Sequence, residues 1–211
     1  MFCYQECIIL IAIIDYGAGN LKSVSNALKF LKYDSVITSD SEQILSADKV
    51  ILPGVGAFGD AMSELKKRNL DKTVYDVVEK GLPFLGICLG MQLLFESSEE
   101  SPGTSGLGIF KGRICRMPNT NGLKIPHIGW NSIDILQNEG MFSGFATPPY
   151  VYFVHSYCLK ADNLDIVACT ATYGETFHAA IEYKNVHATQ FHPEKSGDVG
   201  LKMLKNFIDK G

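Results

Sequence analysis

Residues 82–96 read LPFLGICLGMQLLFE and carry a strong local signal for one type of fold. An apolar run over residues 82–87 leads directly into Cys88, which lies between Gly86 and Gly90. A helix-like pattern of apolar residues follows at once. This order predicts a buried strand, a sharp turn and a helix, with a thiol at the carboxyl end of the strand.

The same alternation extends through the first half of the chain. Strands are predicted at residues 8–15, 35–38, 49–52 and 83–87, and helices at residues 21–32, 61–69, 70–80 and 89–96. Short, continuously apolar strands that alternate with helices indicate an α/β fold with a parallel sheet covered on both faces.

The second half is rich in glycine, proline and short β-like segments, before a helical pattern at residues 199–209. These segments predict antiparallel or mixed strands added to the parallel core. No repeat, linker or low-complexity stretch divides the chain. We therefore expect a single domain over residues 1–211, in which residues 1–7 form a possible N-terminal extension.

Composition narrows the classes of function. A net charge of -4 over 211 residues gives no electrostatic reason to bind nucleic acid. The longest apolar run, residues 8–14, is far shorter than the roughly 20 residues that span a membrane. No signal peptide is recognisable, so we expect a cytoplasmic protein with reduced thiols. The six cysteines form no C-x-x-C pair, and the five histidines show no metal-ligand spacing, so neither metal nor cofactor is predicted.

The environment of Cys88 suits a nucleophile. Glycines before and after it would leave room for a strained turn, and the start of a helix favours a thiolate. The N–H of Leu89 could bind an oxyanion that forms on a substrate. Gln92 and Glu96 follow at helical spacing on the same face, as substrate contacts would. The alternative is that Cys88 is a small buried apolar side chain.

A base and its orienting acid are predicted in QFHPEKS, residues 190–196. Pro193 favours an extended conformation at His192, so Glu194 would point to the same side and hold the imidazole. The alternative is a surface turn with an incidental histidine. The remaining cysteines and histidines lack such neighbours and are predicted to be structural or to support the site from behind.

A second glycine-rich strand end occurs at PGVG, residues 53–56. Ligands of open α/β sheets bind beyond the carboxyl ends of the strands, so Gly54, Val55 and Gly56 would meet the same substrate as Cys88. The alternative is that these glycines only form a tight turn.

Together these residues resemble the triad (class I) glutamine amidotransferases. That family places its nucleophile in G-x-C-x-G, its base and acid in H-P-E, and its oxyanion strand in P-G-x-G, which correspond to Cys88, to His192 and Glu194, and to residues 53–56. The resemblance extends from Ile11 to the C-terminus. It implies a three-layer, flavodoxin-like fold that hydrolyses L-glutamine to L-glutamate and ammonia.

The segments IDYGAGNL, LPGVGAFGDAM, GICLGMQLLFESSEE, KIPHIGWN, YFVHSY and ATQFHPEKSG are similar to one branch of that family, the glutaminase subunit of imidazole glycerol phosphate synthase. This branch serves histidine biosynthesis beside a cyclase subunit with a (β/α)8 barrel. The chain is too short to contain such a barrel, so the cyclase would be a separate chain in a heterodimer.

The resemblance also assigns roles outside the triad. It implies glutamine binding by Gln92, Glu96, Ser156 and Tyr157. It places four further residues at or near the partner interface, namely Asn20, Trp130, Tyr152 and Lys195. From the residues alone, Trp130 and Tyr152 could be core aromatics and Lys195 a solvated charge.

Three other functions stay open at this point. The same glutaminase chemistry could serve a different synthase, such as one in surface-sugar biosynthesis. A peptidase could use the same turn on the same type of sheet, and the chain could be an inactive binding module. The complete HPEKSG and PHIGWN segments favour the amidotransferase over the peptidase, and an intact Cys88, His192 and Glu194 favour an enzyme over an inactive module.

Overall fold

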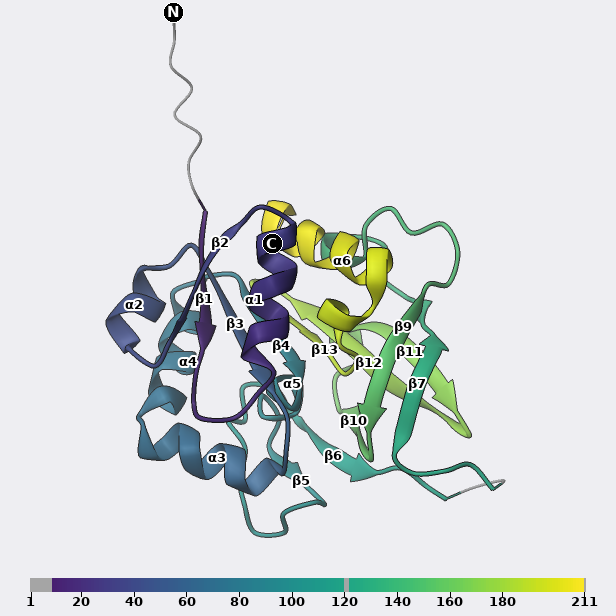
Figure 1. Cartoon of the computed structure of the whole chain (residues 1–211). Coiled ribbons are helices and arrows are strands. Elements are labelled where there is room, and N and C mark those ends of the chain that lie inside the picture. Colours follow the sequence, from purple (N-terminus) through teal and green to yellow (C-terminus); the bar gives the residue numbers. More distant parts are fainter. Residues whose placement is uncertain (1–8, 120–121, 211) are drawn as a thin grey trace, which may run out of the picture.

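The computed structural model of the chain describes residues 9–119 and 122–210 (Figure 1). The proposed N-terminal extension, residues 1–7, lies outside the described residues. None of the helices in the described part has both the length and the apolar character that crossing a membrane requires.

One large mixed sheet organises the molecule. Its strands are β1 (Leu10–Ile14), β2 (Asp34–Thr38), β3 (Lys49–Gly54), β4 (Phe84–Cys88), β5 (Ser97–Ser98), β6 (Gly112–Arg116), β8 (Asp134–Ile135), β10 (Tyr157–Ala161), β11 (Val167–Tyr173), β12 (Glu175–Tyr183) and β13 (Val186–Thr189). Their order is β2-β1-β3-β4-β13-β12-β10-β6-β5, with β11 paired to β12 and to β8. The first five strands in this order, β2, β1, β3, β4 and β13, run parallel to one another. The strands β12, β10, β6, β8 and β11 join the sheet through antiparallel pairs. The prediction of a mainly parallel core with added antiparallel strands is confirmed.

Helices cover both faces of the parallel part, as expected for three layers (Figure 1). One face carries α1 (Leu21–Phe30) and α6 (Gly197–Lys210), and the other carries α2 (Ser41–Ser46), α3 (Phe58–Lys67) and α4 (Leu70–Glu79). Two apolar cores result because alternate residues of each strand face opposite sides: Ile51 packs with α1 and α6, while Val50 and Leu52 pack with the other helices.

A separate two-stranded sheet lies beside β11 and β12 in Figure 1. It consists of β7 (His127–Ser132) and β9 (Tyr150–His155), which run antiparallel with Trp130 opposite Tyr152. The chain changes sheets at Ser156, because β9 ends at His155 and β10 begins at Tyr157. Three short 3-10 turns complete the fold, η1 (Gly140–Phe142), η2 (Leu164–Ile166) and η3 (Pro193–Lys195).

One helix was missed in the sequence, and another was predicted to be longer than it is. The segment α2 was not predicted; it is only six residues long, and the Asp40 side chain caps it by accepting a hydrogen bond from the Glu42 N–H. The helix predicted at residues 89–96 is the single turn α5 (Leu89–Gln92). After Gln92 the backbone turns more tightly, because the Leu94 N–H donates to the Met91 oxygen at 3.1 Å and the Phe95 N–H to the Gln92 oxygen at 3.2 Å, three residues back in each case.

Candidate active site

Cys88 lies at the sharp turn that the sequence predicted. It ends β4 with φ 55° and ψ -108°, in a region that non-glycine residues rarely adopt. A Cβ on Gly86 would lie 2.9 Å from the Gly90 oxygen, and one on Gly90 would lie 1.9 Å from the Leu52 oxygen. The requirement for glycine on both sides of the cysteine is therefore confirmed.

The immediate contacts of the thiol come from a residue that the sequence did not single out. Gln190 is fully buried, and its Nε2 donates to Cys88 Sγ at 3.6 Å. The Oε1 of Gln190 accepts from Gln92 Nε2 at 2.9 Å. Because α5 is one turn long, the helix dipole contributes little here. The neutral Gln190 amide, which Gln92 holds in place, and the nearby histidine are the groups that act on the thiol.

His192 and Glu194 form the predicted pair. Nδ1 of His192 lies 2.8 Å from Glu194 Oε1, and the two side chains are 2% and 1% exposed. A carboxylate only accepts hydrogen bonds, so Nδ1 carries the hydrogen. The backbone also brings the two side chains together, because His192 is extended and the 3-10 turn η3 begins directly after it.

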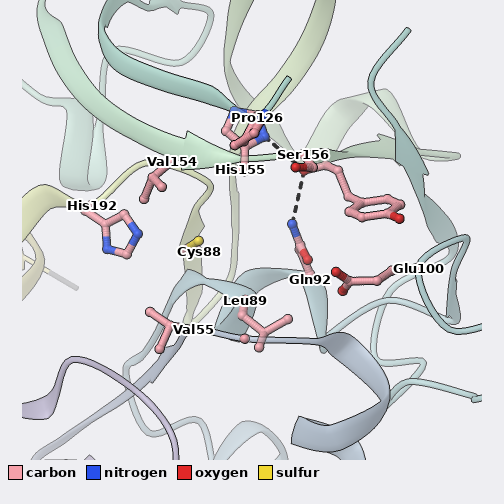
Figure 2. Close-up of a pocket in the computed structure, with 12 residues that line it drawn as sticks. Val55, Cys88, Leu89, Gln92, Glu100, Pro126, Val154, His155, Ser156 and His192 are labelled. Atoms are coloured by element: carbon pink, nitrogen blue, oxygen red, sulfur yellow. Dashed lines mark hydrogen bonds between the residues drawn. The ribbon is translucent and has the colours of Figure 1, made fainter. Parts of the chain in front are cut away.

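The second nitrogen of His192 is the one available for chemistry. Nε2 is buried and has no partner with hydrogen-bond geometry among the described residues, and in Figure 2 the ring lies on the same side of the pocket as Cys88. Burial lowers the pKa of His192, but its interactions with Cys88 and Glu194 outweigh burial and raise the pKa to about 9. Loosely aligned contacts of this kind are common at catalytic pairs before substrate binds.

Neighbouring β9 holds the H-P-E segment in place. The His192 N–H donates to the Tyr152 oxygen at 3.0 Å. Ser196 Oγ donates to the His192 oxygen at 2.6 Å and accepts from the Tyr152 N–H at 2.9 Å. The small sheet therefore fixes the base through backbone hydrogen bonds, so a displacement of Tyr152 would move His192.

A pocket of about 270 Å³ opens above these groups (Figure 2). Its lining residues are Val55, Gly56, Cys88, Leu89, Gln92, Glu100, Pro126, Val154, His155, Ser156, Tyr157 and His192. The volume is just below the usual range of small-molecule sites, roughly 300–1,000 Å³, and suits a ligand of few atoms.

The predicted oxyanion residues lie at one wall of this pocket. Val55, Gly56 and Leu89 line it. Gly54 is paired with Cys88 across β3 and β4, so both strand ends meet beside the pocket. Gly56 has a φ of 102°, which favours glycine, and Val55 is 41% exposed.

The predicted glutamine-binding residues divide into two groups. Gln92, Ser156 and Tyr157 line the pocket, and Gln92 Nε2 also donates to the Tyr157 oxygen at 3.2 Å. Glu96 is exposed and outside the lining, where its Oε2 accepts from the Gly112 N–H at 3.1 Å. The early end of α5 removes Glu96 from the helix face that was predicted, and Glu100 supplies the carboxylate that lines the pocket instead.

A second pair of histidines includes one residue of the pocket lining, His155, and one that packs against it, His127. Nδ1 of His155 lies 2.9 Å from the Tyr157 oxygen, and its Nε2 lies 3.1 Å from Nδ1 of His127. The carbonyl only accepts, so His155 carries its hydrogen on Nδ1 and accepts from His127. Burial lowers the pKa of His127 to about 4 and that of His155 to about 3, so both rings are neutral near pH 7.

The residues assigned to an interface lie at different depths. Trp130 is 56% exposed, so it is not a core aromatic; it lies opposite Tyr152 with ring centroids 6.2 Å apart. Lys195 is exposed, and Tyr152 and Asn20 are half-buried. Trp130 also packs beside Gly197, where its ring would lie 3.9 Å from an added Cβ.

The functional residues that the sequence analysis missed are Gln190 and Glu100. Gln190 lies two residues before His192 and could have been noticed there. Glu100 had no local signal, because its place depends on a turn after Gln92 that the apolar pattern concealed.

Comparison with known proteins agrees with this geometry. The profile of the family "Glutamine amidotransferase class-I" matches residues 12–210. The chain is 49% identical over 203 residues to imidazole glycerol phosphate synthase subunit HisH 1 of Methanococcus maripaludis, which covers 95% of this chain and 99% of that protein. It is 51% identical over 198 residues to the HisH subunit of Caldanaerobacter subterraneus subsp. tengcongensis, which covers 94% of this chain and 97% of that protein.

Solved structures share the fold at much lower identity. A chain of the PurLQS structure from Thermotoga maritima superposes with a TM-score of 0.74 at 18% identity, over 95% of this chain and 97% of that one. A crystal structure of a glutamine amidotransferase gives a TM-score of 0.72 at 19% identity, over 93% of this chain and 98% of that one. The chain belongs to the class-I glutamine amidotransferase family.

Proposed function

We propose that the chain hydrolyses L-glutamine to L-glutamate and ammonia and supplies the ammonia to a cyclase subunit of imidazole glycerol phosphate synthase in histidine biosynthesis. The observation that carries the chemistry is the convergence of Cys88 with the buried His192–Glu194 pair at one wall of the pocket. The identity of about one half to HisH subunits over nearly the whole chain supports the pathway.

In the proposed reaction, Cys88 Sγ attacks the side-chain amide carbon of glutamine. His192 Nε2 takes the thiol proton and returns it to the leaving nitrogen, so ammonia departs and a glutamyl thioester remains. Glu194 holds the Nδ1 hydrogen and stabilises the imidazolium. Water then attacks the thioester, His192 transfers the proton of that water to sulfur, and glutamate leaves.

In the proposed reaction, backbone donors at the strand ends stabilise the tetrahedral oxyanion. Val55, Gly56 and Leu89 line the pocket beside Cys88, so the Leu89 N–H and an N–H of residues 54–56 would act as donors, and one such donor is typically worth about 3 kcal/mol. On the opposite wall, the Glu100 carboxylate suits the substrate α-ammonium. Ser156 and Tyr157 supply polar groups for the remaining end of glutamine, beside the Gln92 amide.

The partner is a cyclase with a (β/α)8 barrel on a separate chain, and it covers the mouth of the pocket. Exposed apolar side chains of the small sheet support a partner interface there. Ile128 is 60% exposed, Trp130 56% and Tyr150 61%. Lys195 lies in η3, directly after Glu194, and Asn20 directly precedes α1. Aromatic side chains in such a patch are typical anchors of an interface.

The position of Val55 suggests how the partner would control the reaction. Turning over the Gly54–Val55 peptide changes whether an N–H or a carbonyl faces the forming oxyanion. Gly54, which forms one side of this peptide, lets this happen at low steric cost. We propose that the cyclase, with its own substrate bound, holds the state in which the N–H faces the oxyanion.

The decisive experiment measures synthesis of imidazole glycerol phosphate by the chain together with its cyclase, once with glutamine and once with ammonium. Wild type uses both nitrogen sources, whereas Cys88→Ala uses ammonium alone. Glutamine-dependent synthesis by Cys88→Ala would refute the nucleophile. If the wild type hydrolysed glutamine but gave no synthesis with the cyclase, the pathway assignment would be wrong.

A further inference from the structure

Tyr16 carries a buried hydroxyl that the proposed reaction does not use. The residue lies in the turn that follows β1, and its side chain is 0% exposed in the core that faces α3 and α4. Its Oη has no hydrogen-bond partner among the described residues. Native proteins rarely leave such a group unpaired, and phenylalanine would fill the same space without this cost.

The hydroxyl lies directly behind the oxyanion wall. A Cβ on Gly54 would be 2.6 Å from Tyr16 Oη, 2.8 Å from Leu89 Cβ and 2.9 Å from the Gly90 nitrogen. The missing side chain of Gly54 is therefore what allows the phenol to reach β3 at the level of Cys88, with which Gly54 is paired.

Residues 54–56 thus have two different sides. Val55 and Gly56 line the pocket together with Cys88, while Gly54 faces the phenol on the core side. In a trans peptide the N–H and the carbonyl point in opposite directions. When the Val55 N–H faces the pocket, the Gly54 carbonyl oxygen therefore faces the core. The unpaired Tyr16 hydroxyl lies on this side of the strand.

We propose that Tyr16 is a positioning residue that holds the active state of the oxyanion strand, by donating its hydroxyl hydrogen to the Gly54 carbonyl oxygen once the Gly54–Val55 peptide turns its N–H toward the substrate. This inference rests on the proposed glutaminase function. The structure shows no hydrogen bond from the Tyr16 hydroxyl. The unpaired hydroxyl therefore destabilises the resting state, and the new hydrogen bond stabilises the active state.

The phenol stays a donor throughout the working pH range. Burial raises the pKa of Tyr16 far above its ordinary value, and the charge of an ionised Cys88 raises it further. Ionisation of the phenol therefore plays no part, and only the hydrogen bond distinguishes tyrosine from phenylalanine here.

The test replaces Tyr16 with phenylalanine and measures glutamine hydrolysis with the cyclase and its substrate present. A neutral hydrogen bond that exists only in the active state predicts that kcat falls about tenfold while KM changes little. The same variant should melt at the same temperature as wild type or higher, because the resting state loses an unpaired buried hydroxyl.

Tyr75→Phe is the matched control. The Tyr75 hydroxyl donates to the Leu107 oxygen, away from the pocket, so its loss should lower the melting temperature and leave kcat unchanged. For Tyr16→Phe, full kcat, or a kcat loss that accompanies a lower melting temperature, would overturn the positioning role.

The pH dependence of Cys88 alkylation distinguishes a hydrogen bond from Tyr16 to the Gly54 carbonyl from one to the Cys88 thiolate. If Tyr16 bound the thiolate instead of the peptide, Tyr16→Phe would shift the alkylation midpoint upward, and that result would overturn the proposal. An unchanged midpoint supports it. A wild type without glutaminase activity would instead refute the function on which the inference rests.

Discussion

Glu194→Gln tests the catalytic pair most sharply. The substitution keeps the size of the side chain and removes its charge. In the structure Glu194 Oε1 lies 2.8 Å from His192 Nδ1, in surroundings that leave both side chains almost fully buried. The variant should still fold, since an amide oxygen can accept the same hydrogen.

The size of the effect follows from the charge that is lost. A hydrogen bond to a charged partner contributes about 1.5–3 kcal/mol, and each 1.36 kcal/mol of transition-state free energy is a factor of ten in rate. If most of that is lost when the imidazolium forms, kcat should fall roughly 10- to 150-fold. Burial already opposes the charged imidazolium, while Cys88 and Glu194 hold the pKa of His192 at about 9, so this pKa should fall in the variant.

Glu182→Gln provides a matched control. Glu182 Oε1 lies 2.9 Å from His187 Nδ1, the side chains are 8% and 6% exposed, and neither residue lines the pocket. Glutamate release is measured against pH for both variants with the cyclase present. Unchanged kcat/KM in Glu194→Gln would refute the role of the acid, and equal losses in both variants would show a general effect of removing a buried carboxylate.

The remaining predictions concern the nucleophile, stability and the partner. A glutamine-like electrophile should label Cys88 alone, as peptide mass mapping would show, and labelling of another cysteine would contradict the assignment. His127 and His155 have lowered pKa values in the folded state, so the unfolded state binds more protons below pH 6.5 and stability falls as the pH falls. At pH 5 each ring should cost about 2 kcal/mol relative to pH 7, so urea unfolding of His127→Gln should show a smaller loss between these pH values; an equal loss would refute the neutral pair. The isolated chain should be a poor glutaminase that the cyclase with bound substrate activates, and full activation of Lys195→Ala would exclude Lys195 from that coupling.

Local pattern was sufficient for the strands and the longer helices of the parallel half of the fold. Continuous apolar strands such as β1 and β4 are buried on both faces, and amphipathic helices such as α1 and α6 bury one stripe. Each pattern can therefore be recognised within a few residues of sequence. The same locality explains why His192 and Glu194 were paired correctly, since only Pro193 separates them.

The length of α5 was harder to predict, because an apolar run does not show which of its side chains face the core. After Gln92 all of residues 93–95 are buried, and only the packed core shows that the chain turns there. The loss of Glu96 from the pocket and the gain of Glu100 both follow from that turn.

Local sequence predicts the chemistry at the strand ends: a thiol between glycines, a histidine with its acid, and a glycine-rich turn. Which other groups meet these residues follows only from the packing of the folded chain. Gln190 reaches the Cys88 sulfur across 102 residues because β13 lies beside β4, and Tyr16 reaches Gly54 because β1 lies beside β3. Such contacts depend on the order of strands in the sheet, which is set by the packing of the whole core and by no local run of residues.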